Sequence, residues 1–134
     1  MSPQILIIDD DKIVVSLLSQ VLQRHGYAVH TAYDGEAGLT LARTLQPSLI
    51  ILDIMMPGLN GYEVCEQLKA NPATANITVL MLTARGQVDE RTPEGQLAIT
   101  EQMHGFAVGA ADFVSKPVQA ALLLKRVETL LWSG

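Results

Sequence analysis

Short apolar runs rich in branched side chains recur along this chain, and three of them carry almost no polar residue. They cover residues 4–8, 48–52 and 77–82. A strand that is apolar at successive positions must be buried on both faces, which is typical of a parallel sheet covered by helices on each side. Shorter runs at 28–31 and 112–115 also have strand character. The sequence therefore predicts five strands of one parallel sheet.

Segments with helical periodicity separate these strands. Apolar residues recur at helical spacing over 13–22, and Gly26 supplies a stop signal. Asp34 and Gly35 can start the next helix, which ends before Pro47. On that helix the inward residues are expected to be Ala37, Leu41, Ala42 and Leu45. Further helices are predicted over 62–69 and 118–131.

The stretch between the fourth and fifth strands is the longest connection. We expect a loop over 85–91. Pro93 is suited to the first turn of a helix, which we expect over 93–108. Three apolar residues share one face of that helix: Ile99, Met103 and Phe106. Connections in such folds are usually about 2–6 residues long, so 85–102 is predicted to be an extended segment.

Strands that alternate with helices predict an α/β fold, a three-layer arrangement with helices on both faces of a parallel sheet. Right-handed crossovers limit the topologies, and the order 2-1-3-4-5 is common for a doubly wound (βα)5 unit. The chain has 134 residues and 49% apolar content, which suit a single domain over 1–134. It ends directly after a helical pattern, so we expect no attached output domain.

Composition excludes several classes of protein. No apolar run approaches the roughly 20 residues that span a bilayer, so no membrane association is expected. The N-terminus lacks the features of a signal peptide, and the one cysteine, Cys65, cannot form an internal disulfide. These features fit a reducing cytoplasm. The net charge is −5 and the Lys and Arg residues are scattered, so this chain alone is not expected to bind nucleic acid.

Polar side chains stand where the predicted strands end. Asp9 and Asp10 follow the first strand, Asp53 the third, Thr83 the fourth and Lys116 the fifth. In a parallel sheet these ends share one edge, and ligands bind there where the strand order reverses. We therefore expect the three acids to converge.

Converging carboxylates repel one another, and a divalent cation relieves the conflict. Oxygen ligands with room for water suit Mg²⁺. Strand alternation sends Asp9 and Asp10 apart, so we assign Asp10 as a direct ligand and Asp9 as one that acts through water. Asp53 would be both a ligand and a nucleophile that accepts a phosphoryl group. Lys116 and the Thr83 hydroxyl would each hold a phosphoryl oxygen.

Four motifs in register carry a resemblance to a known family. They are Ile-Ile-Asp9-Asp10-Asp11, Leu-Asp53-Ile-Met-Met-Pro57-Gly-Leu-Asn-Gly61, Thr83-Ala84-Arg85 and Ser-Lys116-Pro117. Together they cover nearly the whole chain, which resembles the response-regulator receiver (CheY-like) domains of two-component signalling. The resemblance implies a flavodoxin-like fold and a phosphorylation site, rather than an enzyme that acts on other molecules.

The resemblance also implies roles for individual residues. A sensor histidine kinase or a histidine-containing phosphotransfer protein would phosphorylate Asp53, and the Met55 carbonyl would be a further metal ligand. Thr83 would then move toward the phosphoryl group and Phe113 would turn inward. The Lys116–Pro117 bond would be cis. Two further implications concern control: Met55 and Arg85 would tune dephosphorylation, and a partner would bind the face formed by helix four, strand five and helix five.

Two features depart from the family pattern. The extended segment at about 85–102 is expected to lie near the face that partners bind. Val118 replaces an aromatic residue that often follows Lys-Pro. The sequence leaves open the cognate kinase, the signal, the partner, homodimer formation and whether the domain is free-standing.

Other readings compete with phosphorylation. Asp11 is expected to cap the first helix, and Phe113 alone could be a core residue. A receiver that is never phosphorylated would be a protein-binding module, but no acid or lysine of the motif set is lost. A flavodoxin-like cofactor binder needs a loop rich in Ser, Thr and Gly after strand one, where this chain is acidic. A Mg²⁺ phosphatase could use Asp9-x-Asp11, but Lys12-Ile13 follows in place of Gly-Thr.

Overall fold

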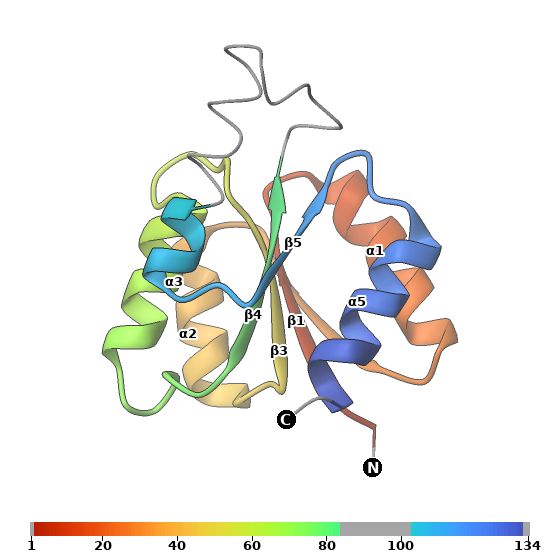
Figure 1. The fold of residues 1–134 in the computed structure, drawn as a ribbon, viewed down its shortest axis with the longest axis horizontal. Coiled ribbons are helices and arrows are strands. Elements are labelled where there is room, and N and C mark those ends of the chain that lie inside the picture. The colour runs from red at the N-terminus through yellow and green to blue at the C-terminus, as the bar shows by residue number, and fades with distance from the viewer. Residues whose placement is uncertain (1, 84–102, 133–134) are drawn as a thin grey trace.

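The computed structural model describes residues 2–83 and 103–132. A central five-stranded sheet has the order β2-β1-β3-β4-β5 (Figure 1). The elements follow one another as β1 (Gln4–Ile8), α1 (Lys12–Arg24), β2 (Ala28–Ala32), α2 (Gly35–Leu45), β3 (Leu49–Asp53), α3 (Gly61–Ala70), β4 (Thr78–Thr83), β5 (Asp112–Ser115) and α5 (Ala120–Trp132). All neighbouring strands pair in parallel. The predicted α/β class and strand order are confirmed.

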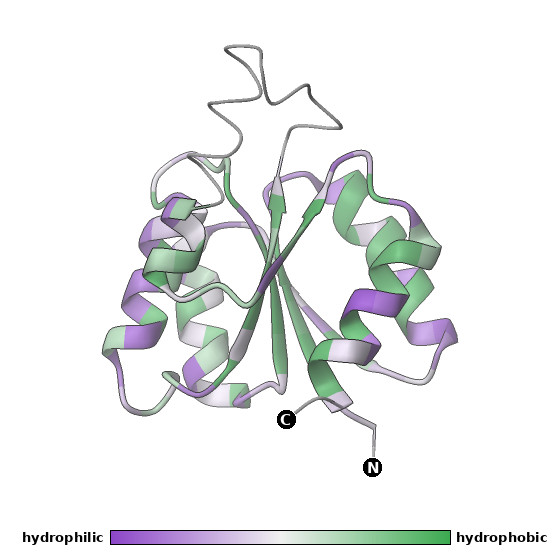
Figure 2. Ribbon diagram, viewed as in Figure 1, coloured by the Kyte–Doolittle hydropathy of each residue, from purple (hydrophilic) through white to green (hydrophobic). Residues whose placement is uncertain are grey.

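Helices cover both faces of the sheet. In Figure 1, α2 and α3 lie on one side of the strands, and α1 and α5 lie on the other. The side chains of β1 alternate between the two layers: Leu6 and Ile8 pack toward α2 and α3, while Ile5 and Ile7 pack toward α1 and α5. All four are fully buried, as the uniformly apolar sequence of the strand predicts. Figure 2 shows the apolar strands as the centre of the molecule.

Polar side chains fix the starts of three helices. Asp11 caps α1 by accepting hydrogen bonds from the backbone N–H groups of Ile13 and Val14. Asp34 caps α2 in the same way through Ala37 N–H. Asn60 and Glu63 form a reciprocal capping box at the start of α3. These caps orient the three helices at the ends of β1, β2 and β3, and the predicted cap at Asp11 is confirmed.

The inward faces of the first two helices differ from a simple reading of the apolar pattern. The buried residues of α1 are Val15, Leu18 and Leu22. Ile13 and Leu17 are 73% and 57% exposed, although they belong to the same apolar series. On α2, Leu39 and Ala42 are buried, but the prediction that Ala37 faces inward is wrong, because this first-turn residue is exposed.

The predicted helix over 93–108 is seen only in part. Residues 103–108 are helical, and the remainder of that prediction, with the loop over 85–91, lies outside the described residues. Helix α5 begins at Ala120, two positions later than expected. None of the helices within residues 2–83 and 103–132 is long and apolar enough to cross a bilayer.

Candidate functional site

The carboxyl ends of the central strands bring three acids together. One carboxylate oxygen from each of Asp9, Asp10 and Asp53 lies within 4.8 Å of the other two. Asp9 and Asp10 follow β1, and Asp53 is the last residue of β3, which pairs directly with β1. The register of two adjacent parallel strands therefore builds the acidic cluster expected at this edge of the sheet.

The two neighbouring acids after β1 have different surroundings. Asp9 is fully buried, whereas Asp10 is exposed. The Asp11 backbone N–H donates a hydrogen bond to Asp9 Oδ1 at 3.0 Å, which turns the Asp9 carboxylate toward the pocket. Although the two residues are adjacent in the chain, both place a carboxylate oxygen in the cluster. The assignment of Asp10 as a direct ligand and of Asp9 as one that acts through water stays a prediction.

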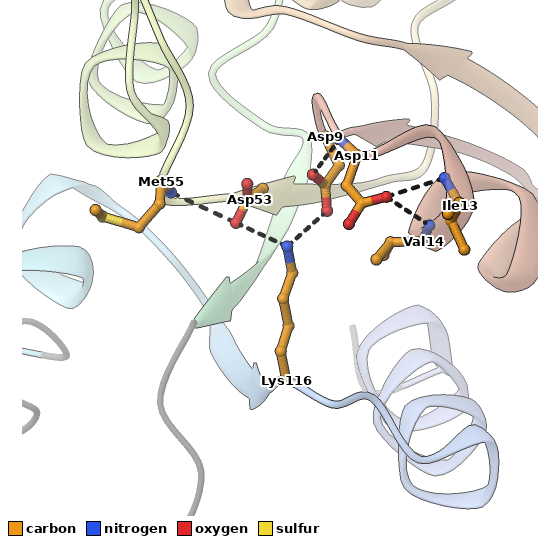
Figure 3. Close-up of polar contacts among 7 residues, drawn as sticks. All are labelled: Asp9, Asp11, Ile13, Val14, Asp53, Met55 and Lys116. Atoms are coloured by element: carbon orange, nitrogen blue, oxygen red, sulfur yellow. Dashed lines mark hydrogen bonds and ion pairs between the residues drawn. The ribbon is translucent and has the colours of Figure 1, made fainter.

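Lys116 reaches into the acidic cluster from the end of β5. Its ammonium nitrogen lies 3.0 Å from Asp9 Oδ2 and 3.3 Å from Asp53 Oδ1 (Figure 3). The lysine side chain is 23% exposed, so the ion pairs sit at the boundary between the pocket and solvent. One ammonium thus bridges two carboxylates that come from different strands, and it compensates only part of their charge.

The electrostatics of the pocket disfavour the ionised form of Asp53. Burial raises the pKa of its carboxyl group from 3.8 to about 6, and the charge of Asp9 adds to this effect. The Lys116 ammonium opposes the shift but does not cancel it. For Lys116 itself, burial would lower the pKa, but the hydrogen bond to Asp9 and the charge of Asp53 outweigh it and raise the pKa. The cluster therefore holds more negative charge than its lysine neutralises.

The turn after β3 needs a glycine at position 61. A β-carbon there would overlap the carbonyl oxygen of Asp53 and lie 2.7 Å from the Ile54 α-carbon. The Gly61 backbone N–H donates to the Ile54 carbonyl at 2.9 Å, which holds the first turn of α3 against the strand end. The motif already contained this glycine, but only the structure shows that its missing side chain lets the chain close behind Asp53.

Met55 follows Asp53 on the rim of the pocket. Its backbone N–H lies 3.4 Å from Asp53 Oδ1, and its side chain is 66% exposed. In Figure 3 that side chain points away from the carboxylates. The expected metal contact through the Met55 carbonyl stays a prediction, and Arg85, the other residue expected to tune dephosphorylation, lies outside the described residues.

The remaining expected residues lie on β4 and β5. Thr83 ends β4 and is buried, and its carbonyl accepts a hydrogen bond of 2.8 Å from the Lys116 backbone N–H. The Lys116–Pro117 peptide bond is cis. Phe113 is half-buried on β5, with its ring edge-on to that of Phe106 at a centroid distance of 4.8 Å. The sequence pattern did not single out Gly105, which borders the Phe113 ring, because the contact depends on how its helical turn packs against β5.

The donor set fits a hard divalent cation. Three carboxylates supply oxygen ligands, and within residues 2–83 and 103–132 the buried Asp9 Oδ2 has no hydrogen-bond donor in reach other than its ion-pair partner Lys116. Mg²⁺ prefers such oxygens together with water. Exposed Asp10 leaves one side of the cluster open to solvent, where bound water has access. The residues that would hold the cation are Asp9, Asp10 and Asp53.

Known proteins share both this sequence pattern and this fold. The model of the response regulator receiver domain family matches residues 5–128. The chain is 43% identical over 129 residues to the DNA-binding dual master transcriptional regulator RpaA of Synechocystis sp., which covers 96% of this chain and 49% of RpaA. It is 34% identical to the protein PilH of Pseudomonas aeruginosa, which covers 96% of this chain and 97% of PilH.

Solved structures agree with these sequence matches. A putative response regulator from Chloroflexus aurantiacus superposes with a TM-score of 0.85 at 34% identity, over 98% of each chain. The chemotaxis protein CheY4 of Vibrio cholerae gives a TM-score of 0.84 at 30% identity, over 98% of this chain and 100% of that one. The chain spans about half the length of RpaA (49%) and 26% of the response regulator PleD of Caulobacter vibrioides. With the family model matching most of its length, the chain belongs to the response regulator receiver domains of two-component signalling.

Proposed function

We propose that this domain accepts a phosphoryl group on Asp53 and responds with a change of shape that controls a partner. The donor would be the phosphohistidine of a sensor histidine kinase or of a histidine-containing phosphotransfer protein. The observation that carries the proposal is the buried Asp53 carboxylate, which lies 3.3 Å from the Lys116 ammonium in a cluster of three acids. The domain would act in the cytoplasm as a single unit over residues 1–134.

The chemistry asks little of the protein beyond position and charge compensation. An Asp53 carboxylate oxygen would attack phosphorus as the P–N bond of the phosphohistidine breaks. The imidazole would leave with the bonding electrons and take up a proton. A Mg²⁺ ion held by Asp9, Asp10 and Asp53, with the Met55 carbonyl as a further ligand, would neutralise charge on the phosphoryl oxygens.

Residues around Asp53 would then contact the new phosphoryl group. Lys116 would exchange its contact with Asp53 Oδ1 for one with a phosphoryl oxygen, which draws the end of β5 toward β3. Thr83 would donate its hydroxyl to another oxygen. Because the Lys116 backbone also donates to the Thr83 carbonyl, the ends of β4 and β5 would move together. The face formed by the helix expected over 93–108, β5 and α5 would carry the change to an effector or to a second copy of the domain.

The test is labelling with acetyl phosphate and Mg²⁺. The wild type should gain one phosphoryl group, and Asp53→Asn should gain none. Asp112→Asn is a matched control, since it makes the same chemical change at the first residue of β5. This end of the strand lies away from the carboxyl ends that form the pocket. Equal labelling of Asp53→Asn and the wild type would refute the assignment. No labelling of the wild type by acetyl phosphate or by any phosphohistidine donor would favour the alternative, a receiver that binds proteins without phosphorylation.

A further inference from the structure

The ring of Phe113 occupies a place that is open only because residue 105 has no side chain. A β-carbon added to the buried Gly105 would lie 2.5 Å from Phe113 Cζ and 2.8 Å from its Cε1. It would also lie 3.2 Å from the sulfur of Met81. Carbon atoms that are not bonded pack best at about 3.5–4.0 Å, so a methyl group at this position must displace a neighbour.

The ring is held on its other sides by packed residues. Met81 of β4 is fully buried and is the register partner of Phe113. Phe106 presents its ring edge-on at 4.8 Å and an interplanar angle of 81°. Phe113 also packs against the core between the sheet and α2 and α3. The Phe113 ring therefore occupies a closely packed inward site, and Gly105 forms one side of that site.

The helical turn that carries Gly105 is anchored to α3 independently of Phe113. The Cys65 thiol donates to the Val108 carbonyl at 3.5 Å. The rings of Tyr62 and His104 meet edge-on at a centroid distance of 4.4 Å. Because these contacts hold residues 103–108 from the side of α3, we expect a side chain at position 105 to be accommodated by rotation of the Phe113 ring rather than by a shift of the helical turn.

Phe113 is also connected to the acidic cluster through β5. It lies three residues before Lys116, whose ammonium contacts Asp53 and whose backbone contacts Thr83. We infer that Gly105 is a positioning residue: because it has no side chain, the Phe113 ring can occupy this inward site, which favours the state that a phosphoryl group on Asp53 would select. The second half of this inference rests on the proposed function, and the first half does not.

Thermal unfolding without metal tests the placement. Alanine normally stabilises a helix relative to glycine, because glycine loses more backbone freedom on folding. We expect Gly105→Ala to lower the midpoint in the wild type and to raise it in a Phe113→Ala background. Ala107→Gly, at an exposed position of the same helical turn, is the matched control and should lower the midpoint equally in both backgrounds. A Gly105→Ala effect of the same sign in both backgrounds would overturn the placement.

Spectroscopy and a phosphoryl mimic test the coupling. The chain has only two phenylalanines, so selective ¹³C labelling of phenylalanine resolves both rings. Gly105→Ala should shift both ring signals, because Phe106 packs on Phe113. In the presence of Mg²⁺ the variant should bind beryllofluoride several-fold more weakly than the wild type. Unchanged ring signals would refute the placement, and shifted signals with unchanged affinity would refute the coupling.

The wild type separates this inference from the proposed function. If wild-type protein binds no beryllofluoride, the proposed role of Asp53 and the coupling both fail. The ring signals and unfolding midpoints would still decide whether Gly105 places Phe113. If the wild type binds the mimic but Gly105→Ala behaves like the wild type in every measurement, only the inference about Gly105 fails.

Discussion

Asp53 is an ionisable side chain in a place where its charge is costly. Only 2% of the residue is exposed, and the Asp9 carboxylate is a close neighbour. These two causes raise its pKa to about 6. The fold therefore holds the Asp53 carboxylate in an unfavourable electrostatic setting, which a bound cation would relieve. Such settings are typical of functional sites rather than of residues selected for stability.

This setting predicts how stability depends on pH. Because the pKa of Asp53 is higher in the folded chain (about 6) than the ordinary 3.8, the folded state holds this proton more tightly. The carboxyl group thus contributes to stability below about pH 4, and the contribution is lost as pH rises through 6. Without metal, Asp53→Asn should be more stable than the wild type at pH 7.5, by on the order of 3 kcal/mol at most. The two should converge near pH 4.

Urea unfolding of both proteins in chelator at pH 4 and 7.5 measures this difference. Asp112→Asn serves as the control, since it removes a carboxylate whose side chain is 28% exposed and paired with Arg126. An Asp53→Asn variant that is less stable than the wild type at pH 7.5 would show that the ion pair with Lys116 outweighs burial and repulsion at this site.

Two glycines of the turn after β3 are needed for different reasons, and substitution separates them. Gly58 has φ +74° with nothing within 4 Å of an added β-carbon, so Gly58→Ala should cost only about 1–2 kcal/mol of backbone strain. Gly61→Ala would press against the backbone of Asp53 and Ile54 and should cost about 3 kcal/mol or more. Chemical denaturation measures both. Equal costs would show that the turn can widen behind Asp53.

At the scale of elements, the helical spacing of apolar residues predicts that a helix forms. Where apolar residues cover a wide part of the helix surface, it does not predict which of them are buried. On α1, Ile13, Leu17 and Leu18 all fit the period, and only Leu18 lies against the sheet. Which residues are buried depends on how α1 packs against the sheet, and the period alone does not determine that packing. Ala37 was assigned to the wrong face because the buried face of α2 is formed by Gly35, Gly38, Leu39 and Ala42, and Ala37 lies off that face.

The two apolar faces of α1 should respond differently to mutation. Leu18→Ala removes buried side-chain volume and should cost about 2–5 kcal/mol. Leu17→Ala, the neighbouring exposed leucine, should change stability by no more than about 0.5 kcal/mol. Thermal or urea unfolding gives both values from one preparation. A large loss for Leu17→Ala would mean that α1 is rotated relative to the burial described for it.

At the scale of the whole molecule, topology was the most predictable property. Uniformly apolar strands such as 48–52 indicate burial on both faces, and parallel strands with right-handed crossovers leave few possible orders. That topology also predicts which strand ends meet, so the sequence alone indicates that Asp9, Asp53, Thr83 and Lys116 lie together. What the sequence could not supply was contact across the fold, such as Gly105 against Phe113 or Lys116 between two carboxylates.

Metal binding should be visible as a property of the whole fold. A cation held by Asp9, Asp10 and Asp53 binds ligands that converge only in the folded chain, so it should stabilise that chain by mass action, by about 2.7 kcal/mol at 100 times its dissociation constant. We expect Mg²⁺ to raise the thermal midpoint of the wild type. Asp10→Asn should weaken this effect without loss of stability in chelator, because Asp10 is exposed.

The control for this experiment is the exposed cap residue Asp34. It lies on the turn after β2, outside the acidic cluster, so Asp34→Asn keeps the three carboxylates and should keep the full response to Mg²⁺. Calcium at equal ionic strength distinguishes a fitted site from general screening, because a small octahedral site prefers the smaller ion. An equal rise of the midpoint in Asp10→Asn and the wild type would remove Asp10 from the ligand set and leave Asp9 and Asp53 to account for the metal.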